Sequence, residues 1–486
     1  MAIAPPNILW LFCDELRADA LSCYGNEHAQ IATPHIDSIA ADGVRFDRFY
    51  VDSPVCVSAR AAYKSGLSPM RTGIYHNAGS DLGAAIPVES FTARLRRAGY
   101  LTVNLGKEHV PPELRGFDLS DKEGAKQIDL VMQAGAMRGR LGTITEGVGM
   151  NAATWPSDLP FPPEVLTDKA VRWLTDDRPE DRPWMLRVSY LQPHTPVIPP
   201  EPWASKYDDQ PWPETFGPAD GLSNFERNFG QIPARDLTTE QIVAAQSRYH
   251  GLVAWLDDQI GQLLAAVDRL GLRENTIIVF GSDHGAHLGE LGGAYSKQLF
   301  TPWSQRVPFM VSWPGELERG VVNPELACSV DLGPTLLDLV GAERAEVCDG
   351  RALFSDPEPA HIVGAIGYGA PGVAAMAAIG IGYWPDGTGW PQRFCVRSRQ
   401  WRYDRSTRRE GKMLGADEHD AFLADTDADP REERNVISQH ADIASEMEAI
   451  LASALTSAVQ ISNEDYTAHL ADKEKRRRTM LKEYSQ

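Results

Sequence analysis

The sequence predicts an α/β fold with a mostly parallel central sheet flanked by helices, followed by a small C-terminal α+β subdomain. Short apolar runs alternate with amphipathic segments along most of the chain, which is typical of a parallel sheet covered on both faces. A stretch rich in Gly and Pro, residues 364–391, then precedes a region with a different pattern. We therefore predict a large domain over residues 1–375 and a subdomain with a short antiparallel sheet and a helical tail over residues 376–486.

Four apolar runs have the length and composition of buried strands. In chain order they are residues 8–12, 100–105, 185–191 and 276–280. Helical patterns are found at residues 35–41, 89–98, 166–175 and 240–270. Pro34 suits the first turn of the first helix, and Gly99 and Gly271 suit helix C-termini.

Two later segments lack this alternation. Residues 196–235 are rich in Pro and Trp without periodicity, which predicts a long surface excursion beside a site. Its aromatic rings could form a cage for a quaternary ammonium group, or they could simply pack. In the C-terminal region a strand pair is predicted at residues 394–396 and 400–403, and a helix at residues 441–459.

Composition limits the classes of function. The chain has 486 residues, of which 43% are hydrophobic and 23% are charged, an ordinary globular composition. With 47 basic and 67 acidic residues the net charge is −20, which argues against binding to nucleic acid or to anionic membranes. No segment reaches the roughly 18 apolar residues that a membrane span needs.

The N-terminal residues lack the basic stretch and cleavage site of a secretory signal, and the six cysteines lack Cys-x-x-Cys spacing. We therefore expect reduced thiols and a cytoplasmic location. A basic run at residues 473–478 of this acidic chain indicates a solvated or subunit-contacting helix, so we expect a homo-oligomer.

Ionisable residues follow the ends of the predicted strands, namely Asp14, Glu15, Lys107, His109, His194, Asp283 and His284. Since parallel strands end at one edge of a sheet, where ligands bind, we expect a site there. A divalent ion, Ca²⁺, Mg²⁺ or Mn²⁺, suits a donor set of carboxylates and one imidazole, here Asp14, Glu15, Asp283 and His284. The alternative for the first two acids is a helix N-terminus, where negative charge is favourable.

The most unusual segment surrounds Cys56. An extended piece ends at Cys56, and a run of good helix formers continues to Gly66. A thiol at a helix N-terminus has a lowered pKa and lies where anions bind. Arg60 and Lys64 fall on one helical face, which predicts a cationic cradle for a sulfate or phosphate ester. The ordinary alternative is that Cys56 is a small buried apolar residue.

On these residues and on further motifs the chain resembles a type I sulfatase of the alkaline phosphatase superfamily. The matching segments, in order, are NILWLFCDELRADALSCYG, ATPHIDSIAADGVRF, CVSARAAYKSG, LRRAGYLTVNLGKEH, LQPHTP, YHGLVAWLDDQIG, IIVFGSDHGAHLGE, SKQLFTPWSQRVPFMVSWPG, CSVDLGPTLLDLVG and FLADTDADPREERNVI. The pair Asp283-His284 and the residue Asn77 most resemble the branch of choline sulfatases and phosphonate monoester hydrolases. The resemblance implies an alkaline-phosphatase-like large domain, with a short C-terminal sheet closing over the site.

The resemblance also implies two cofactors. Cys56 would be oxidised by a formylglycine-generating enzyme to formylglycine, whose hydrate attacks sulfur or phosphorus. One divalent ion, calcium or manganese, would be held by Asp14, Asp283 and His284. Glu15 stands where the family usually has Asp or Gln, and it would either bind the ion or flank it. The family motif reads Cys-x-Pro-x-Arg, sometimes with Ala in third place, whereas this chain has Ser58 there.

The remaining roles follow from the same resemblance. Arg60 and Lys107 would stabilise the hydrated aldehyde and the anion, and Asn77 would help hold the sulfate. His109 would assist collapse of the covalent intermediate, while His194 and Lys297 would neutralise or protonate the leaving oxygen.

The predicted function is therefore metal-dependent hydrolysis of sulfate monoesters, with a small anionic ester as substrate. Two alternatives stay open: a phosphonate monoester or phosphodiester hydrolase on the same scaffold, and a non-catalytic relative that binds anions.

Overall fold

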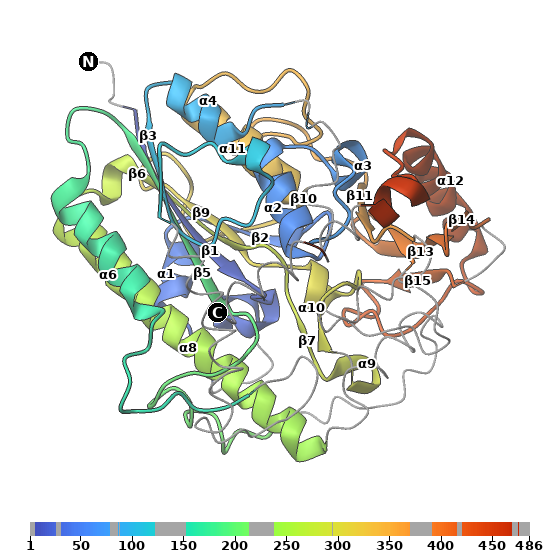
Figure 1. Cartoon of the computed structure of the whole chain (residues 1–486), viewed down its shortest axis with the longest axis horizontal. Coiled ribbons are helices and arrows are strands. Elements are labelled where there is room, and N and C mark those ends of the chain that lie inside the picture. Colours follow the sequence, from blue (N-terminus) through green and yellow to red (C-terminus); the bar gives the residue numbers. More distant parts are fainter. Residues whose placement is uncertain are drawn as a thin grey trace.

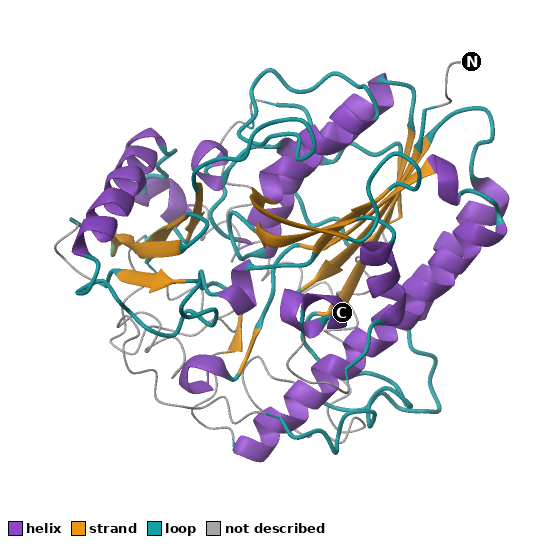
Figure 2. Cartoon of the chain, turned by 180° about the vertical axis from the view of Figure 1, so that it is seen from behind, coloured by secondary structure: helices purple, strands orange, loops and turns teal. Residues whose placement is uncertain are grey.

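A computed structural model gives the structure of the chain. It describes residues 5–25, 31–77, 86, 88–121, 152–212, 238–293, 295–369, 391–415, 420–468 and 475. A large sheet carries helices on both faces, and a smaller sheet with its own helix lies beside it (Figure 1). Figure 2 shows the same two parts from behind, with the long helix α8 running along one side of the large sheet.

The large sheet has eight strands in the order β10-β2-β9-β6-β1-β5-β3-β4. All neighbours are parallel except β9, which runs antiparallel to β2 and β6. The strands are β1 (Asn7–Asp14), β2 (Val44–Tyr50), β3 (Leu101–Gly106), β4 (Leu119–Asp121), β5 (Trp184–Pro193), β6 (Thr276–Ser282), β9 (Phe309–Ser312) and β10 (Val321–Cys328). The four predicted strands are β1, β3, β5 and β6, which lie side by side in the middle of the sheet, so the predicted fold class is confirmed.

The central strand β1 shows why this sheet is covered on both faces. All eight of its residues are buried. Leu9 and Leu11 pack into one hydrophobic cluster, while Trp10 and Phe12 pack into the other. Side chains alternate across a strand, so a continuous apolar run requires a layer of helices on each side.

Two helical layers meet this requirement. One cluster is closed by α1 (Pro34–Ala41), α6 (Glu164–Arg172) and α8 (Thr239–Arg269), and the other by α2 (Cys56–Ser65), α4 (Phe91–Arg97) and α11 (Leu332–Leu339). The helix α8 begins at a capping box formed by Thr238 and Gln241. Gly66 (φ 70°) follows α2 in the left-handed region that glycine adopts without strain.

Short elements connect these layers. They are η1 (Ala18–Ala20), η2 (Ser22–Tyr24), α3 (Pro69–Thr72), η4 (Pro112–Leu114), η5 (Trp173–Asp177), η6 (Arg273–Asn275), β7 (His287–Leu288), α9 (Glu290–Gly293), β8 (Tyr295–Ser296), α10 (Pro302–Gln305) and η7 (Ser329–Asp331). The strands β7 and β8 pair in an antiparallel hairpin. Within the described part of the chain, no helix combines the length and apolar character needed to cross a membrane.

The smaller sheet is antiparallel and lies against α12 (Ala441–Ser457). Its strands are β11 (Ile362–Ile366), β12 (Gln392–Arg397), β13 (Trp401–Arg409), β14 (Lys412–Met413) and β15 (Phe422–Asp425). The predicted C-terminal strand pair is β12 and β13. The predicted domain boundary after residue 375 lies outside the described residues, as do residues 213–235 of the Pro- and Trp-rich excursion and all of the basic run except Lys475.

Candidate active site

Side chains from separate strand ends meet at the carboxyl edge of the central strands. Asp14 is the last residue of β1, Lys107 follows β3, and Asp283 follows β6. Cys56 is the first residue of α2, which brings its side chain to the same place. The parallel order β6-β1-β5-β3 therefore produces the cluster that the sequence predicted.

A group of buried donors surrounds Cys56. Asp14, Cys56, Asp283 and His284 each offer one donor atom, and these atoms all lie within 4.8 Å of one another. The Cys56 Sγ lies 3.2 Å from His284 Nε2 and 3.9 Å from Asp14 Oδ1. Two carboxylates and an imidazole at this spacing suit a divalent ion that prefers oxygen and accepts nitrogen.

The ring of His284 is fixed by its other nitrogen. Nδ1 lies 2.8 Å from the carbonyl oxygen of Gly285, so Nε2 faces the cluster. Burial acts to lower the pKa of His284, but the Asp283 carboxylate outweighs it and the pKa rises to about 9. Gly285 is packed so closely that a Cβ there would lie 2.0 Å from the Trp303 carbonyl oxygen.

Two buried cations neutralise the acids. Arg60 Nε lies 2.6 Å from Asp283 Oδ2, and Arg60 Nη2 lies 3.1 Å from Asp14 Oδ2. Lys107 Nζ forms a further ion pair with Asp14. Burial and Cys56 would raise the pKa of the Asp14 carboxyl, but Lys107, His194 and Arg60 lower it below its ordinary value. Asp14 is therefore held as a carboxylate.

The charges around Cys56 stabilise an anion at its position. Burial acts to raise the pKa of the Cys56 thiol, yet Lys107, Lys297 and His284 outweigh burial and hold that pKa well below its ordinary value. His109 adds a hydrogen bond to the same sulfur. An atom with partial negative charge at residue 56 would thus be favoured.

A second cluster joins the first through Cys56. Lys297 Nζ lies 3.1 Å from the Cys56 sulfur, 3.1 Å from His194 Nε2 and 2.7 Å from Glu15 Oε1. Glu15 Oε1 is also 3.3 Å from His194 Nε2. These distances group Glu15 with Lys297 and His194. Glu15 is not one of the three residues whose metal-ligating atoms surround Cys56, but it forms a second group of possible metal-ligating residues with Asp14 and His194.

The segment after β3 explains how two of its residues reach the site. Lys107 and His109, two residues apart, both contact the Asp14–Cys56 region, whereas Glu108 between them lies 3.3 Å from Ser120 Oγ. His109 has φ 43°, in the left-handed region, so the chain turns at this residue.

Asn77 is held against the first turn of α2. Its Oδ1 accepts a hydrogen bond from the Val57 N–H at 3.0 Å. The Ser58 hydroxyl donates to the Ile74 carbonyl oxygen, so two bonds join this turn to the segment that carries Asn77. With the exception of Lys64, every residue predicted for the site therefore lies in or beside the Cys56 cluster.

The predicted cradle of Arg60 and Lys64 is wrong for Lys64. The Lys64 Nζ lies 2.6 Å from Thr92 Oγ1 and 3.8 Å from the centre of the Phe117 ring, away from the Cys56 cluster. Lys64 is one helical turn further from the N-terminus of α2, and Phe117 and Thr92 pack over that turn.

Sequence reasoning missed two hydroxyl groups that hold the site. Ser189 Oγ accepts a hydrogen bond from Arg60 Nη1 at 3.1 Å, and the Tyr249 hydroxyl donates to the Glu15 carbonyl oxygen at 2.7 Å. Ser189 lies inside β5 and Tyr249 inside α8, where nothing in the local pattern distinguishes a functional hydroxyl from a structural one.

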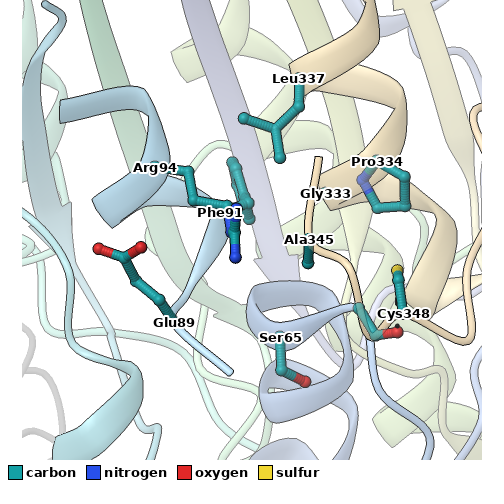
Figure 3. Close-up of a pocket in the computed structure, with 10 residues that line it drawn as sticks. Ser65, Glu89, Phe91, Arg94, Gly333, Pro334, Leu337, Ala345 and Cys348 are labelled. Carbon is teal, nitrogen blue, oxygen red and sulfur yellow. Dashed lines mark hydrogen bonds between the residues drawn. The ribbon is translucent and has the colours of Figure 1, made fainter. Parts of the chain in front are cut away.

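A small cavity lies at the other end of α2 (Figure 3). It is lined by Ser65, Gly66, Glu89, Phe91, Arg94, Gly333, Pro334, Leu337, Ala345 and Cys348. None of these is a predicted site residue, so this cavity is separate from the Cys56 cluster.

Comparison with known proteins gives one family. The family model described as Sulfatase matches residues 6–342. An arylsulfatase of Clostridium perfringens is 29% identical over 380 residues, covering 72% of this chain and 77% of the relative. A choline-sulfatase of Rhizobium meliloti is 29% identical over 389 residues, covering 73% and 72%. The structure of the phosphonate monoester hydrolase of Agrobacterium radiobacter matches with a TM-score of 0.73 at 22% identity, over 93% of this chain and 96% of that one. A choline-sulfatase is therefore among the sequence relatives, and the phosphonate monoester hydrolase shares the fold.

Proposed function

Because the chain belongs to the sulfatase family and is a sulfuric ester hydrolase, we propose that it hydrolyses sulfate monoesters at residue 56 with one divalent metal ion. The observation that carries this proposal is the position of the Cys56 side chain. It lies 3.2 Å from His284 in the donor group and 3.1 Å from Lys297 in the second cluster. A nucleophilic atom on residue 56 would therefore lie next to the metal ligands and next to Lys297, which we assign to the leaving group.

The donor group fits a hard divalent ion, Ca²⁺ or Mn²⁺. Asp14, Asp283 and His284 would hold it, because their donor atoms converge and are buried. When present, the ion would withdraw charge from the ester oxygens, and a formylglycine made from Cys56 would supply a hydrated oxygen as nucleophile. A formylglycine-generating enzyme would be a transient partner.

The chain's own cations bind the sulfate. Arg60 is held rigidly by two carboxylates, and Lys107 pairs with one of them, so positive charge is fixed where negative charge develops on the ester. Asn77 would add an amide contact. His109 would move a proton at residue 56, since it already hydrogen-bonds to that side chain.

Lys297 and His194 would deliver a proton to the leaving oxygen. Their tips lie 3.1 Å apart, and Lys297 reaches the Cys56 sulfur. A poor leaving group, such as an alkoxide, needs this proton in the transition state, whereas a nitrophenolate hardly does.

A second candidate is hydrolysis of phosphonate monoesters or phosphodiesters at the same residues. The structural match to a phosphonate monoester hydrolase supports a scaffold able to hold such a site. These esters are singly charged tetrahedral anions like sulfate monoesters, so the same cations would bind them.

The test is a turnover panel with the purified full chain: an aryl sulfate, choline sulfate, an aryl phosphonate monoester and a phosphodiester. We expect a sulfate monoester to give the highest kcat/KM. Preference for a phosphonate or phosphodiester would establish the second candidate, and turnover of none of the four would contradict both. The expected cytoplasmic location and homo-oligomer stay predictions from the sequence.

A further inference from the structure

The hydroxyl of Tyr249 joins the middle of α8 to the turn that follows β1. Tyr249 is 1% exposed. Its hydroxyl donates to the Glu15 carbonyl oxygen at 2.7 Å and accepts from the Arg17 N–H at 3.1 Å. One phenol oxygen therefore contacts the backbone on both sides of Leu16.

This turn has an unusual conformation that needs such support. Glu15 has φ 63°, in the left-handed region that residues with a side chain seldom adopt. Its N–H lies 3.3 Å from Asp283 Oδ1, and the Leu16 N–H donates to Ser282 Oγ at 3.0 Å. Together with Tyr249, these bonds fix the chain direction at Glu15.

The consequence is that two neighbouring carboxylates have different ion-pair partners, although their donor atoms both lie within 4.8 Å of one on His194. Asp14 contacts Arg60 and Lys107 in the group around Cys56. Glu15, one residue later, reaches Lys297 at 2.7 Å and His194 at 3.3 Å. If Glu15 left its left-handed conformation, its carboxylate would move away from Lys297 and His194.

The same helix also holds the segment that leads to Lys297. Gln246, one turn before Tyr249, donates from Nε2 to the Leu288 carbonyl oxygen at 2.9 Å. Leu288 belongs to the β7–β8 hairpin, and Lys297 directly follows β8. One face of α8 thus supports both the Glu15 turn and the hairpin that presents Lys297.

We infer that Tyr249 is a positioning residue for the leaving-group cluster, acting through the backbone of Glu15 on Lys297 and His194. This inference rests on the proposed function, because it assigns Lys297 and His194 to the leaving oxygen. Tyr249 itself touches no reacting atom. It directs one carboxylate to the two proton donors while Asp14 stays with the metal ligands.

The test is Tyr249→Phe, which removes only the hydroxyl. The matched control is Tyr100→Phe, which removes a buried hydroxyl that donates to the Pro6 carbonyl oxygen at 2.7 Å, before the start of β1. We measure kcat and KM for an alkyl sulfate and for nitrophenyl sulfate, the bound divalent metal, and Tm. In Tyr249→Phe we expect kcat for the alkyl sulfate to fall by about tenfold or more and kcat for nitrophenyl sulfate by less than about threefold. In Tyr249→Phe we expect KM and metal content to stay unchanged. In the control Tyr100→Phe we expect only Tm to fall.

A second variant keeps the inference testable if Tyr249→Phe does not fold. Glu15→Gln retains the side-chain shape, and we expect the same selective loss on the alkyl sulfate. In the double variant the two losses should not add, because both act through one carboxylate. Equal losses on both substrates, loss of the metal, or unchanged kcat in either variant would overturn the role of Tyr249. If the wild-type chain turns over no sulfate ester, the result contradicts the proposed function and not the role of Tyr249.

Discussion

At the scale of single residues, charge around Cys56 is balanced by direct pairing. Arg60 bridges Asp14 and Asp283, and all three side chains are at most 1% exposed. Removing one member of such a buried group leaves another charge without compensation, which costs about 3 kcal/mol or more. Substitutions here therefore affect both chemistry and folding, and conservative shapes make the clearer tests.

We expect Asp283→Asn to abolish metal binding and to lower activity by more than about a hundredfold, because it removes a charged ligand but preserves shape. Metal content of the purified protein and kcat on the best sulfate ester are the measurements. Glu358→Gln, which changes a surface partner of Arg399, is the control. Full activity in metal-stripped wild-type protein would contradict the metal's role.

Ser58 permits a second test at this scale. We expect Ser58→Pro to raise the fraction of residue 56 present as aldehyde, measured by mass spectrometry of the peptide, because Pro restores the family motif. The kcat of Ser58→Pro, divided by the fraction of molecules that carry the aldehyde, should fall by about threefold to tenfold. The reason is that the hydrogen bond from the Ser58 hydroxyl to the Ile74 carbonyl oxygen is lost. Ser58→Ala loses the bond without gaining the motif. An active wild-type protein with only an intact thiol would exclude formylglycine.

A pH dependence follows from Asp52. Burial raises the pKa of this carboxyl from 3.8 to about 7, against an opposing hydrogen bond from Ser329. The folded chain binds this proton more tightly than the unfolded chain, so the associated stability is complete below about pH 4 and is lost as pH rises through about 7. We expect Asp52→Asn to flatten the fall in unfolding free energy between about pH 4 and 7. Asp427→Asn, on the surface, should leave the slope unchanged, and an unchanged slope in Asp52→Asn would contradict the assignment.

The site could be predicted from the sequence wherever a residue follows a strand end or begins a helix. Asp14, Lys107 and Asp283 were found because parallel strands bring their carboxyl ends together. The direction of Lys64 could not be predicted, since it depends on Phe117 and Thr92, which pack there from other segments.

At the scale of elements, the strands that the sequence predicted are those buried on both faces. β2 reads VRFDRFY, in which charged residues alternate with apolar ones. β4 has only three residues at the edge of the sheet, and β9 has only four. β10 contains Pro324 and an irregular register between Asn323 and Leu326. Short, polar or interrupted strands lack a periodic signal, so tertiary pairing alone defines them.

At the scale of the whole molecule, Arg397 of the small sheet joins the two sheets. Its guanidinium donates to the Phe300 carbonyl oxygen at 2.6 Å and to Gln305 Oε1 at 2.6 Å. It also forms a paired contact with Glu432 and lies 4.3 Å from the centre of the Tyr50 ring. Because Phe300 follows Lys297 by three residues, this contact supports the segment that presents Lys297.

We expect Arg397→Met to lower the unfolding free energy by about 2 kcal/mol. The buried Glu432 carboxylate loses its paired contact with Arg397 and, among the described residues, keeps only Arg402 Nη1, at 3.1 Å. The rate on an alkyl sulfate should fall further than the rate on nitrophenyl sulfate, as the Lys297 segment loses its support. Thermal unfolding and kcat are the measurements, with the neighbouring surface residue in Arg399→Met as control. If stability falls but the rates on the two esters fall by the same factor, the contacts of Arg397 have a structural role only.

The burial of Cys56 limits when its side chain could be oxidised relative to folding. Its side chain is 1% exposed, and every residue of α2 is buried. An enzyme that oxidises residue 56 must therefore act before α2 packs against the sheet. A molecule that folded before this oxidation would keep its thiol until it unfolded again. We expect the active fraction of a preparation to depend on the rate of oxidation relative to the rate of folding during synthesis. Slower folding should therefore increase the active fraction, whereas longer incubation of folded protein should not.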